Sequence, residues 1–572
     1  MGLGSSLLQP QELVAFKKLP SSVPLDSIEI PEKSENRTRT NFGWLITLGI
    51  FVLVFIPFMG YTLYHSNIKR IMVGYDQCGN VCGMKNEKFD GISCSGKDMT
   101  NLPYLHYTNG HDIHSPRNCV AECPSGTKPV NGVCVSSTSN SDSSVTNGVS
   151  SSQIQPDLPV YLNSVVWQTI ICALLSILVS MGMLFLFRHA TACLVWSIII
   201  ICYSAFIIAS VAFWVLSASA QNEQQQYNFR YAAIVFTVAT IILGIVFIWF
   251  RKRIGLVILL LQEATKAVFD MPQLVLIPVF LFFTLALLTA IFVVVTLYVW
   301  SAGELVPLNN GQNYYYFRPS SIAIFTLTYN FVIYIWLTQF FIGIQYMTIA
   351  GGIAKWYFTR EKSYVHSPIA TSIYNSFKFH LGTVAMGAWI ITMMNIIKTL
   401  ILSLCKNAIV RAVVRSILEP LEDLIKYLSK NAYIMTALHG QPFVKSGKRA
   451  AKILIDNLGN VIAINYIGDF VLGMAKLLIV VITILISMAI FAIAPSAYPD
   501  QSNLFPYIFI GIVALISASI TFAVFDTTID SLFICYCEDR LINDGMEKPY
   551  YMSRNLMEFI EDSKKVYDKT NN

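Results

Sequence analysis

A single uncharged run near the middle of the chain constrains the fold more than any other feature. From Ser321 to Ala350 it contains no Lys, Arg, Asp or Glu. An α-helix rises about 1.5 Å per residue, so this run is long enough to cross a hydrocarbon core of about 30 Å. It therefore predicts a membrane-spanning helix, and the basic residues Lys355, Arg360 and Lys362 that follow place its end in the cytosol.

Eight further apolar runs have similar length, at residues 42–64, 160–187, 190–217, 231–250, 271–300, 379–404, 465–494 and 505–528. Only 13% of the 572 residues are charged, about half the fraction of a soluble protein, and the mean hydropathy is +0.55. These features predict an all-α polytopic membrane protein in contact with the lipid bilayer. The net charge of +6 is typical of basic cytoplasmic loops, so no nucleic-acid partner is expected.

The number of crossings is open at this point. Nine spans would put the two ends of the chain on opposite sides, yet the loop before the last run, APSAYPDQSNLFP, has no Lys or Arg and is predicted to be external. Either the 379–404 run is re-entrant, or residues 408–428 make an additional, unusually polar crossing. In the second case the charges at Arg411, Arg415, Glu419, Glu422 and Asp423 must face protein or water.

Six of the twelve cysteines lie in the polar segment after the first span: Cys78, Cys82, Cys94, Cys119, Cys123 and Cys134. An even set in a short polar block predicts three disulfides in an oxidising compartment, with 15 possible connectivities. The alternative is a zinc site, because two C-x3-C pairs are present. An extracellular location favours disulfides, so no metal is expected.

Three separated strings carry a family resemblance: QYMTIAGGIAKWYFTREK from Gln345, HLGTVAMGAWIIT from His380 and EDRLINDGMEKPYYMS from Glu538. With the ectodomain strings GYDQCGNVCG and NCVAECP, the chain from about Gly74 onward resembles the choline transporter-like family, solute carrier family 44. The resemblance implies about ten transmembrane helices, a small disulfide-bonded ectodomain between the first two, and both termini in the cytosol. It also implies a plasma-membrane transporter of choline, with ethanolamine as a further substrate, that supplies phospholipid synthesis without a cofactor.

The expected organisation follows from this topology. Residues 1–41 form a cytosolic tail, 42–64 the first helix, 65–159 the ectodomain with a Ser-rich tether, 160–534 the transport domain and 535–572 a second cytosolic tail. The start Met1–Ser6 matches the N-myristoylation pattern, which is short and often matched by chance. The only sequon, at Asn36, lies on the cytosolic side in this topology.

No enzyme motif is present: the sequence lacks a Walker A pattern, G-x-S-x-G and H-E-x-x-H. A quaternary ammonium such as choline has no N–H to donate, so its site is expected to surround the methyl groups with aromatic faces. The aromatic candidates are Tyr203, Trp214, Tyr329, Trp336, Tyr346 and Trp389. Partners for the choline hydroxyl are Gln339, Gln345 and Asn395. The alternative is that these side chains only pack helices together.

Charged residues near the apolar runs are candidates for coupling transport to protons or other cations: Glu263, His380, Lys398, Asp469, Asp526 and Asp530. The alternatives are that Lys398 snorkels to the interface and that the carboxylates pair with Lys476 or with loop arginines. We therefore expect a facilitative or proton-coupled transporter. A receptor or scaffold that acts through the ectodomain, and a cation channel, remain as alternatives.

Overall fold

The computed structural model describes residues 30–89, 91–108, 116–130, 132–136, 158–220, 223–307, 315–362, 367–493, 504–543 and 548–552. The myristoylation motif, almost all of the Ser-rich tether and residues 553–572 lie outside this set. The chain forms two compact units. One comprises Leu45–Pro159 and Phe283–Gln339, and the other comprises Met1–Trp44, Val160–Phe282 and Phe340–Asn572. We call the first the ectodomain unit and the second the bundle unit.

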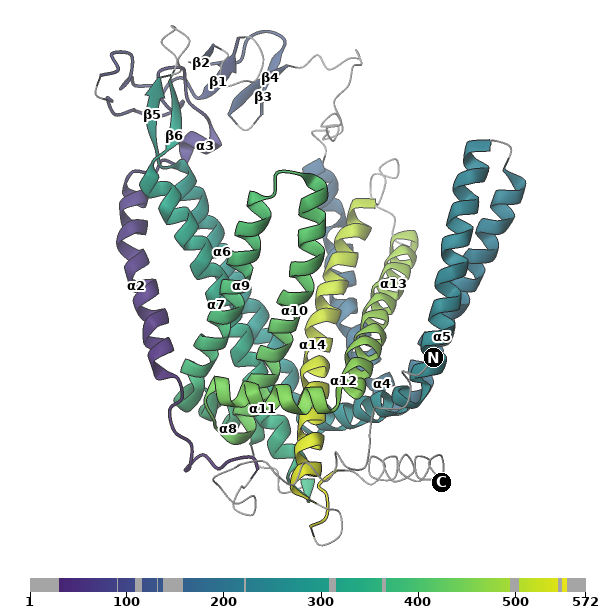
Figure 1. The fold of residues 1–572 in the computed structure, drawn as a ribbon. Coiled ribbons are helices and arrows are strands. Elements are labelled where there is room, and N and C mark those ends of the chain that lie inside the picture. The colour runs from purple at the N-terminus through teal and green to yellow at the C-terminus, as the bar shows by residue number, and fades with distance from the viewer. Residues whose placement is uncertain are drawn as a thin grey trace. The chain divides into compact units, whose positions relative to one another are not determined.

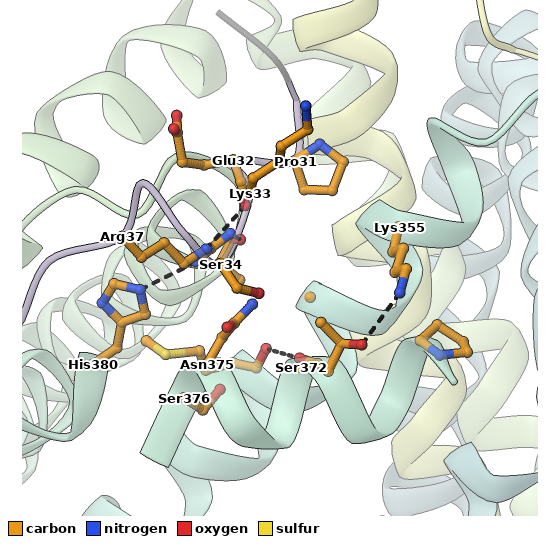
Figure 2. A pocket seen from close by; sticks show the side chains of 15 residues that line it. Pro31, Glu32, Lys33, Ser34, Arg37, Lys355, Ser372, Asn375, Ser376 and His380 are labelled. Atoms are coloured by element: carbon orange, nitrogen blue, oxygen red, sulfur yellow. Dashed lines mark hydrogen bonds between the residues drawn. The ribbon is translucent and has the colours of Figure 1, made fainter. Parts of the chain in front are cut away.

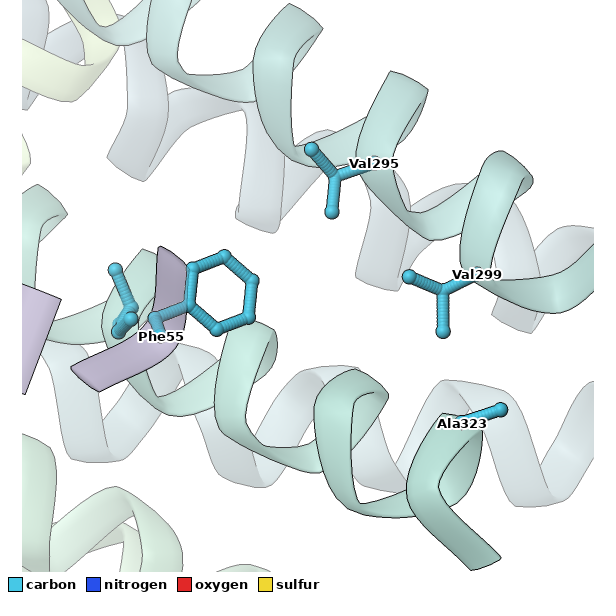
Figure 3. Close-up of a cluster of buried hydrophobic side chains, with 5 residues drawn as sticks. Phe55, Val295, Val299 and Ala323 are labelled. Atoms are coloured by element: carbon cyan, nitrogen blue, oxygen red, sulfur yellow. The ribbon is translucent and has the colours of Figure 1, made fainter. Parts of the chain in front are cut away.

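The ectodomain unit contains most of helix α2 (Phe42–Tyr64), most of α6 (Leu276–Ser301) and the first half of α7 (Ser321–Tyr357). Phe55 from α2, Val295 and Val299 from α6, and Ala323 from α7 form a buried apolar cluster (Figure 3). This cluster joins the three helices below the ectodomain.

The ectodomain itself has a four-stranded sheet in the order β2-β1-β4-β3, built from Tyr104–Tyr107 (β1), Arg117–Val120 (β2), Thr127–Val130 (β3) and Val133–Ser136 (β4). A short helix α3 (Lys69–Met72) and an antiparallel hairpin of β5 (Gly303–Pro307) and β6 (Tyr315–Pro319) complete it. The six cysteines form the disulfides Cys78–Cys94, Cys82–Cys119 and Cys123–Cys134, which confirms the predicted disulfides and excludes the zinc alternative for these six.

The bundle unit holds the remaining helices (Figure 1): α4 (Leu158–Ser219), α5 (Glu223–Asp270), α8 (Pro368–Asn375), α9 (Leu381–Leu404), α10 (Ala408–His439), α11 (Phe443–Asp456), α12 (Leu458–Ala463), α13 (Asp469–Ile493) and α14 (Leu504–Ile542). A 3-10 turn (Pro272–Val275) precedes α6, and π-helical turns join α8 to α9 (Ser376–His380) and α12 to α13 (Ile464–Gly468). The backbone of Ala190 is non-helical, so α4 consists of two helices, as predicted.

Helix α10 covers residues 408–428, for which the sequence left an additional crossing open. Lys398 of α9 pairs with Glu422 of α10, and Tyr433 of α10 donates to the carbonyl of Val384 of α9, so the two helices are antiparallel neighbours (Figure 1). With 32 residues α10 is about 48 Å long. This geometry favours an additional crossing over a re-entrant run.

Eight helical segments of the described residues are long and apolar enough to cross a membrane, and α10 is not among them. One of the eight is the kinked segment Trp167–Ser219, which has 53 residues and consists of two helices joined at Ala190. With α10 added, the described part of the chain has ten membrane-length helices. This agrees with the predicted all-α fold of about ten spans.

Candidate functional site

A buried ammonium lies inside the bundle unit between helices α10, α14 and α7. Nζ of Lys430 is 2.6 Å from Oδ2 of Asp526 and 2.7 Å from Oδ2 of Asp530. The same atom lies 5.3 Å from the centre of the Tyr346 ring. A cation is therefore held by two carboxylates and an aromatic face, and we call these four residues the cation cluster.

The helix geometry explains why these groups meet. Asp526 and Asp530 are one turn apart on α14, so both carboxylates point to the same side. The side chains of Lys430 and Asp530 are only 10% and 7% exposed, whereas that of Asp526 is 44% exposed. Asp526 is thus more exposed at the protein surface than Lys430 or Asp530. The sequence-based alternative of pairing with Lys476 or loop arginines is wrong, because the partner is Lys430.

A line of charges on α10 leads along the helix to this cluster. Its members are Arg411, Arg415, Glu419, Glu422, Lys426 and Lys430. At 100° per residue they fall within about 100° of one another around the helix, so they form one polar stripe. Glu422 is buried and accepts from both Lys398 and Lys426, and Arg415 pairs with Glu419. Lys398 is thus part of an ion-pair network, which the snorkelling alternative did not include.

The carboxylate of Asp539, near the end of α14, gathers donors from three parts of the bundle unit. It accepts from the Tyr357 hydroxyl at 3.0 Å, from Asn543 at 2.7 Å, and from the backbone amides of Tyr551 and Met552. Arg360 donates to the carbonyl of Pro549. These contacts, which we call the α7–α14 clasp, tie the end of α7 to residues 548–552.

Lys362 closes the end of α7 beside the clasp. Its ammonium donates to the carbonyls of Trp356, Tyr357 and Thr359 and lies 4.3 Å from the centre of the Trp356 ring. Burial lowers the pKa of Lys362 to about 8, although the carboxylates of Glu263 and Asp270 act in the opposite direction. Glu263 itself pairs with Lys266 and lines a cavity here together with Trp356 and Lys362.

Residues 30–41 form an N-terminal strap across α8, α9 and α10. Arg37 donates to the carbonyl of Ala437 at 2.6 Å and contacts Nε2 of His380 at 3.1 Å, and Thr40 contacts Nδ1 of the same histidine. Gly382 is required here, because a Cβ atom would collide with the backbone of Asn41. His380 therefore serves to hold the strap.

Two of the aromatic candidates on α7 lie in the ectodomain unit. The Tyr329 ring stacks on Phe51 at 4.3 Å, and its hydroxyl donates to the Phe51 carbonyl. Trp336 is fully buried, with its ring edge-on to the same Phe51. These contacts are packing between α2 and α7. Tyr346 lies about two turns beyond the unit boundary, in the cation cluster.

The other candidates are dispersed through the bundle unit. Tyr203 and Trp214 of α4 contact α5 through Phe247 and Thr237, and Trp389 of α9 lies 6.4 Å from Trp44. The Asn395 amide donates within its own helix to Ile391. Gln345 is buried, and its Oε1 has no hydrogen-bond partner among the described residues. For Gln339, near the middle of α7, the structure gives no specific polar contact in the described region.

The structure therefore brings together only Tyr346, Asp526 and Asp530 of the predicted site residues. It adds Lys430, which the sequence-based reasoning missed. The signal for Lys430 was its place at the end of the α10 charge stripe, directly before the uncharged stretch Asn431–Leu438.

Comparison with known proteins decides the family. Residues 234–541 match the family described as plasma-membrane choline transporter. Choline transporter-like protein 1 of Xenopus laevis is 30% identical, over 93% of this chain and 94% of its own length. The chain belongs to the choline transporter-like family. Choline transporter-like protein 3 of Homo sapiens is 27% identical over 93% of this chain and 92% of its own, and choline transporter-like protein 2 of Dictyostelium discoideum is 26% identical over 91% and 94%.

The three sequence strings that carry the family resemblance lie at two places in the bundle unit. The strings from Gln345 and Glu538 meet in the α7–α14 clasp, and the string from His380 holds the N-terminal strap. In this choline transporter-like chain, all three motifs therefore serve contacts within the bundle unit.

Proposed function

We propose that the protein transports choline across the plasma membrane, with both termini in the cytosol, and that the cation cluster is its recognition site. The observation that carries the proposal is the position of the Lys430 ammonium, 5.3 Å from the Tyr346 ring and between two carboxylates. An aromatic face and nearby negative charge are what a quaternary ammonium requires. The names of the relatives support the same substrate.

In this mechanism Lys430 is a resident cation that choline displaces from Asp530. When the trimethylammonium group lies against Tyr346 and neutralises Asp530, the Lys430 ammonium stays paired with Asp526. The buried carboxylates then never lack a cation, which avoids the cost of an unpaired buried charge. Gln345 precedes Tyr346 in the sequence, and its buried Oε1, which lacks a partner among the described residues, accepts a hydrogen bond from the choline hydroxyl.

Proton coupling and ethanolamine transport follow from the same groups. Asp526 is half-exposed and shares Lys430 with the buried Asp530, so it is the carboxylate at which a coupling cation would compete for the cluster. Ethanolamine carries a primary ammonium, which can donate to these carboxylates and to Gln345. The site therefore accepts both amines, and the methylated one gains more from Tyr346.

The test is uptake of labelled choline into proteoliposomes that contain the purified full-length protein. We expect saturable uptake that excess ethanolamine reduces and that an imposed pH gradient changes. Flux that does not saturate would indicate a channel. Absence of any flux in vesicles with folded protein would favour a receptor or scaffold.

A further inference from the structure

A second cavity lies where the N-terminal strap crosses the bundle unit, and its chemistry is opposite to that of the cation cluster. We propose that it binds a phosphate group, from a cytosolic phosphomonoester or a lipid headgroup, and that the bound group fastens the strap to α7 and α8. The inference does not depend on which substrate the protein transports.

The cavity has a volume of about 220 Å³, well above the 10–15 Å³ or so that one water needs. Lys33, Ser34 and Arg37 of the strap line it on one side. Lys355 of α7 and Asn375 of α8 line it on the other (Figure 2). A ligand in the cavity therefore touches both parts.

The charges that line the cavity favour an anion. Three of the lining side chains are cationic, Lys33, Arg37 and Lys355, and Glu32 is the one acidic side chain among the described lining residues. A net charge of about +2 repels choline and ethanolamine and matches a phosphate group that carries one to two negative charges.

Arg37 shows that the positive charge here is poorly compensated. The guanidinium is buried, and burial lowers the pKa of Arg37 to about 10 while Glu32 offsets only part of this effect. Its hydrogen-bond acceptors are the carbonyls of Glu32, Thr436 and Ala437 and the ring of His380, all of them neutral groups. An anion in the cavity stabilises this charge.

A buried amide supplies a second, independent sign of a ligand. Asn375 is 9% exposed, and its Oδ1 has no hydrogen-bond partner among the described residues. In Figure 2 its side chain points away from α8 towards Ser34, into the space between the strap and the helix. A 180° turn of the amide presents its NH2 group, which then donates to a phosphate oxygen together with the hydroxyls of Ser34 and Ser376.

The experiment measures the unfolding temperature of the purified full-length protein with increasing inorganic phosphate, at constant ionic strength set by chloride. We expect a saturable rise for the wild type and for the control Lys378→Met, which removes an exposed lysine outside the cavity. The rise should disappear in the Lys33→Met/Lys355→Met double variant. No rise in the wild type, or an equal rise in the double variant, would overturn the proposal.

Two further experiments test the proposal if the double variant folds poorly. Asn375→Asp keeps the side-chain shape but adds a negative charge, so it should weaken phosphate binding at least tenfold; unchanged binding contradicts the proposal. Nanodiscs with and without phosphatidylinositol 4-phosphate separate the two sources. Protection of residues 30–41 from hydrogen exchange only with this lipid assigns the site to a headgroup, and protection by inorganic phosphate alone assigns it to a soluble phosphomonoester.

Discussion

Nζ of Lys430 lies 2.7 Å from Oδ2 of Asp530, and both side chains are buried, on two helices about a hundred residues apart in the sequence. A buried ion pair is costly to break from one side, because the remaining charge has left water without a partner. This pair therefore links the stability of the bundle unit to the proposed site.

Replacing Lys430 with Met leaves Asp530 buried without its ammonium. We expect a loss of about 3–5 kcal/mol in the free energy of unfolding. The double variant Lys430→Met/Asp530→Asn should recover much of this loss, because it removes both buried charges. Denaturant unfolding of the purified protein measures the effect.

The control is Lys266→Met, which breaks the Lys266–Glu263 pair, where the lysine side chain is 52% exposed. It should cost less than about 1 kcal/mol. If Lys430→Met and Lys266→Met lowered the free energy of unfolding equally, the buried pair would contribute no more to stability than the exposed one.

Removing the Tyr357 hydroxyl should loosen the α7–α14 clasp. Tyr357→Phe deletes one donor to Asp539, and a hydrogen bond to a charged group is worth about 1.5–3 kcal/mol. We expect faster proteolytic cleavage near Tyr551, measured on protein in nanodiscs. Tyr466→Phe, at an exposed tyrosine, should leave the cleavage rate unchanged, and no difference between the two variants would refute the clasp.

Lys362 should titrate well below an ordinary lysine. With a pKa of about 8 it should react with acetic anhydride with a midpoint near pH 8, whereas a model lysine titrates near 10.4. Between these values the unfolded chain holds a proton that the folded chain has released, so this group makes the folded state more stable as the pH rises. A midpoint at or above pH 10, read by mass spectrometry, would contradict the burial of this ammonium.

The apolar spans could be predicted from the sequence because hydrophobic length alone defines them. Residues 42–64 match α2, and the break expected between the runs 160–187 and 190–217 lies at Ala190 of α4. Helix α10 could not be predicted in the same way. Its buried charge at Glu422 is stabilised by Lys398 on another helix, and hydrophobic length does not reveal such a partner.

The site was predictable only in part for the same reason. Residue types suggested aromatic rings and carboxylates, and Tyr346, Asp526 and Asp530 do meet. The rings of Tyr329 and Trp336 share a helix with Tyr346, but they pack against α2. Periodicity places residues on one face of a helix, and only the neighbouring helices decide what that face contacts.

The most direct test of the cation cluster is the KM for choline uptake by Tyr346 variants in proteoliposomes. A cation–π contact in a desolvated site is worth about 2 kcal/mol, so Tyr346→Ala should raise KM by about 30-fold, while Tyr346→Phe keeps the aromatic face and stays within about threefold of the wild type. Saturable choline uptake with an unchanged KM in Tyr346→Ala would contradict the account.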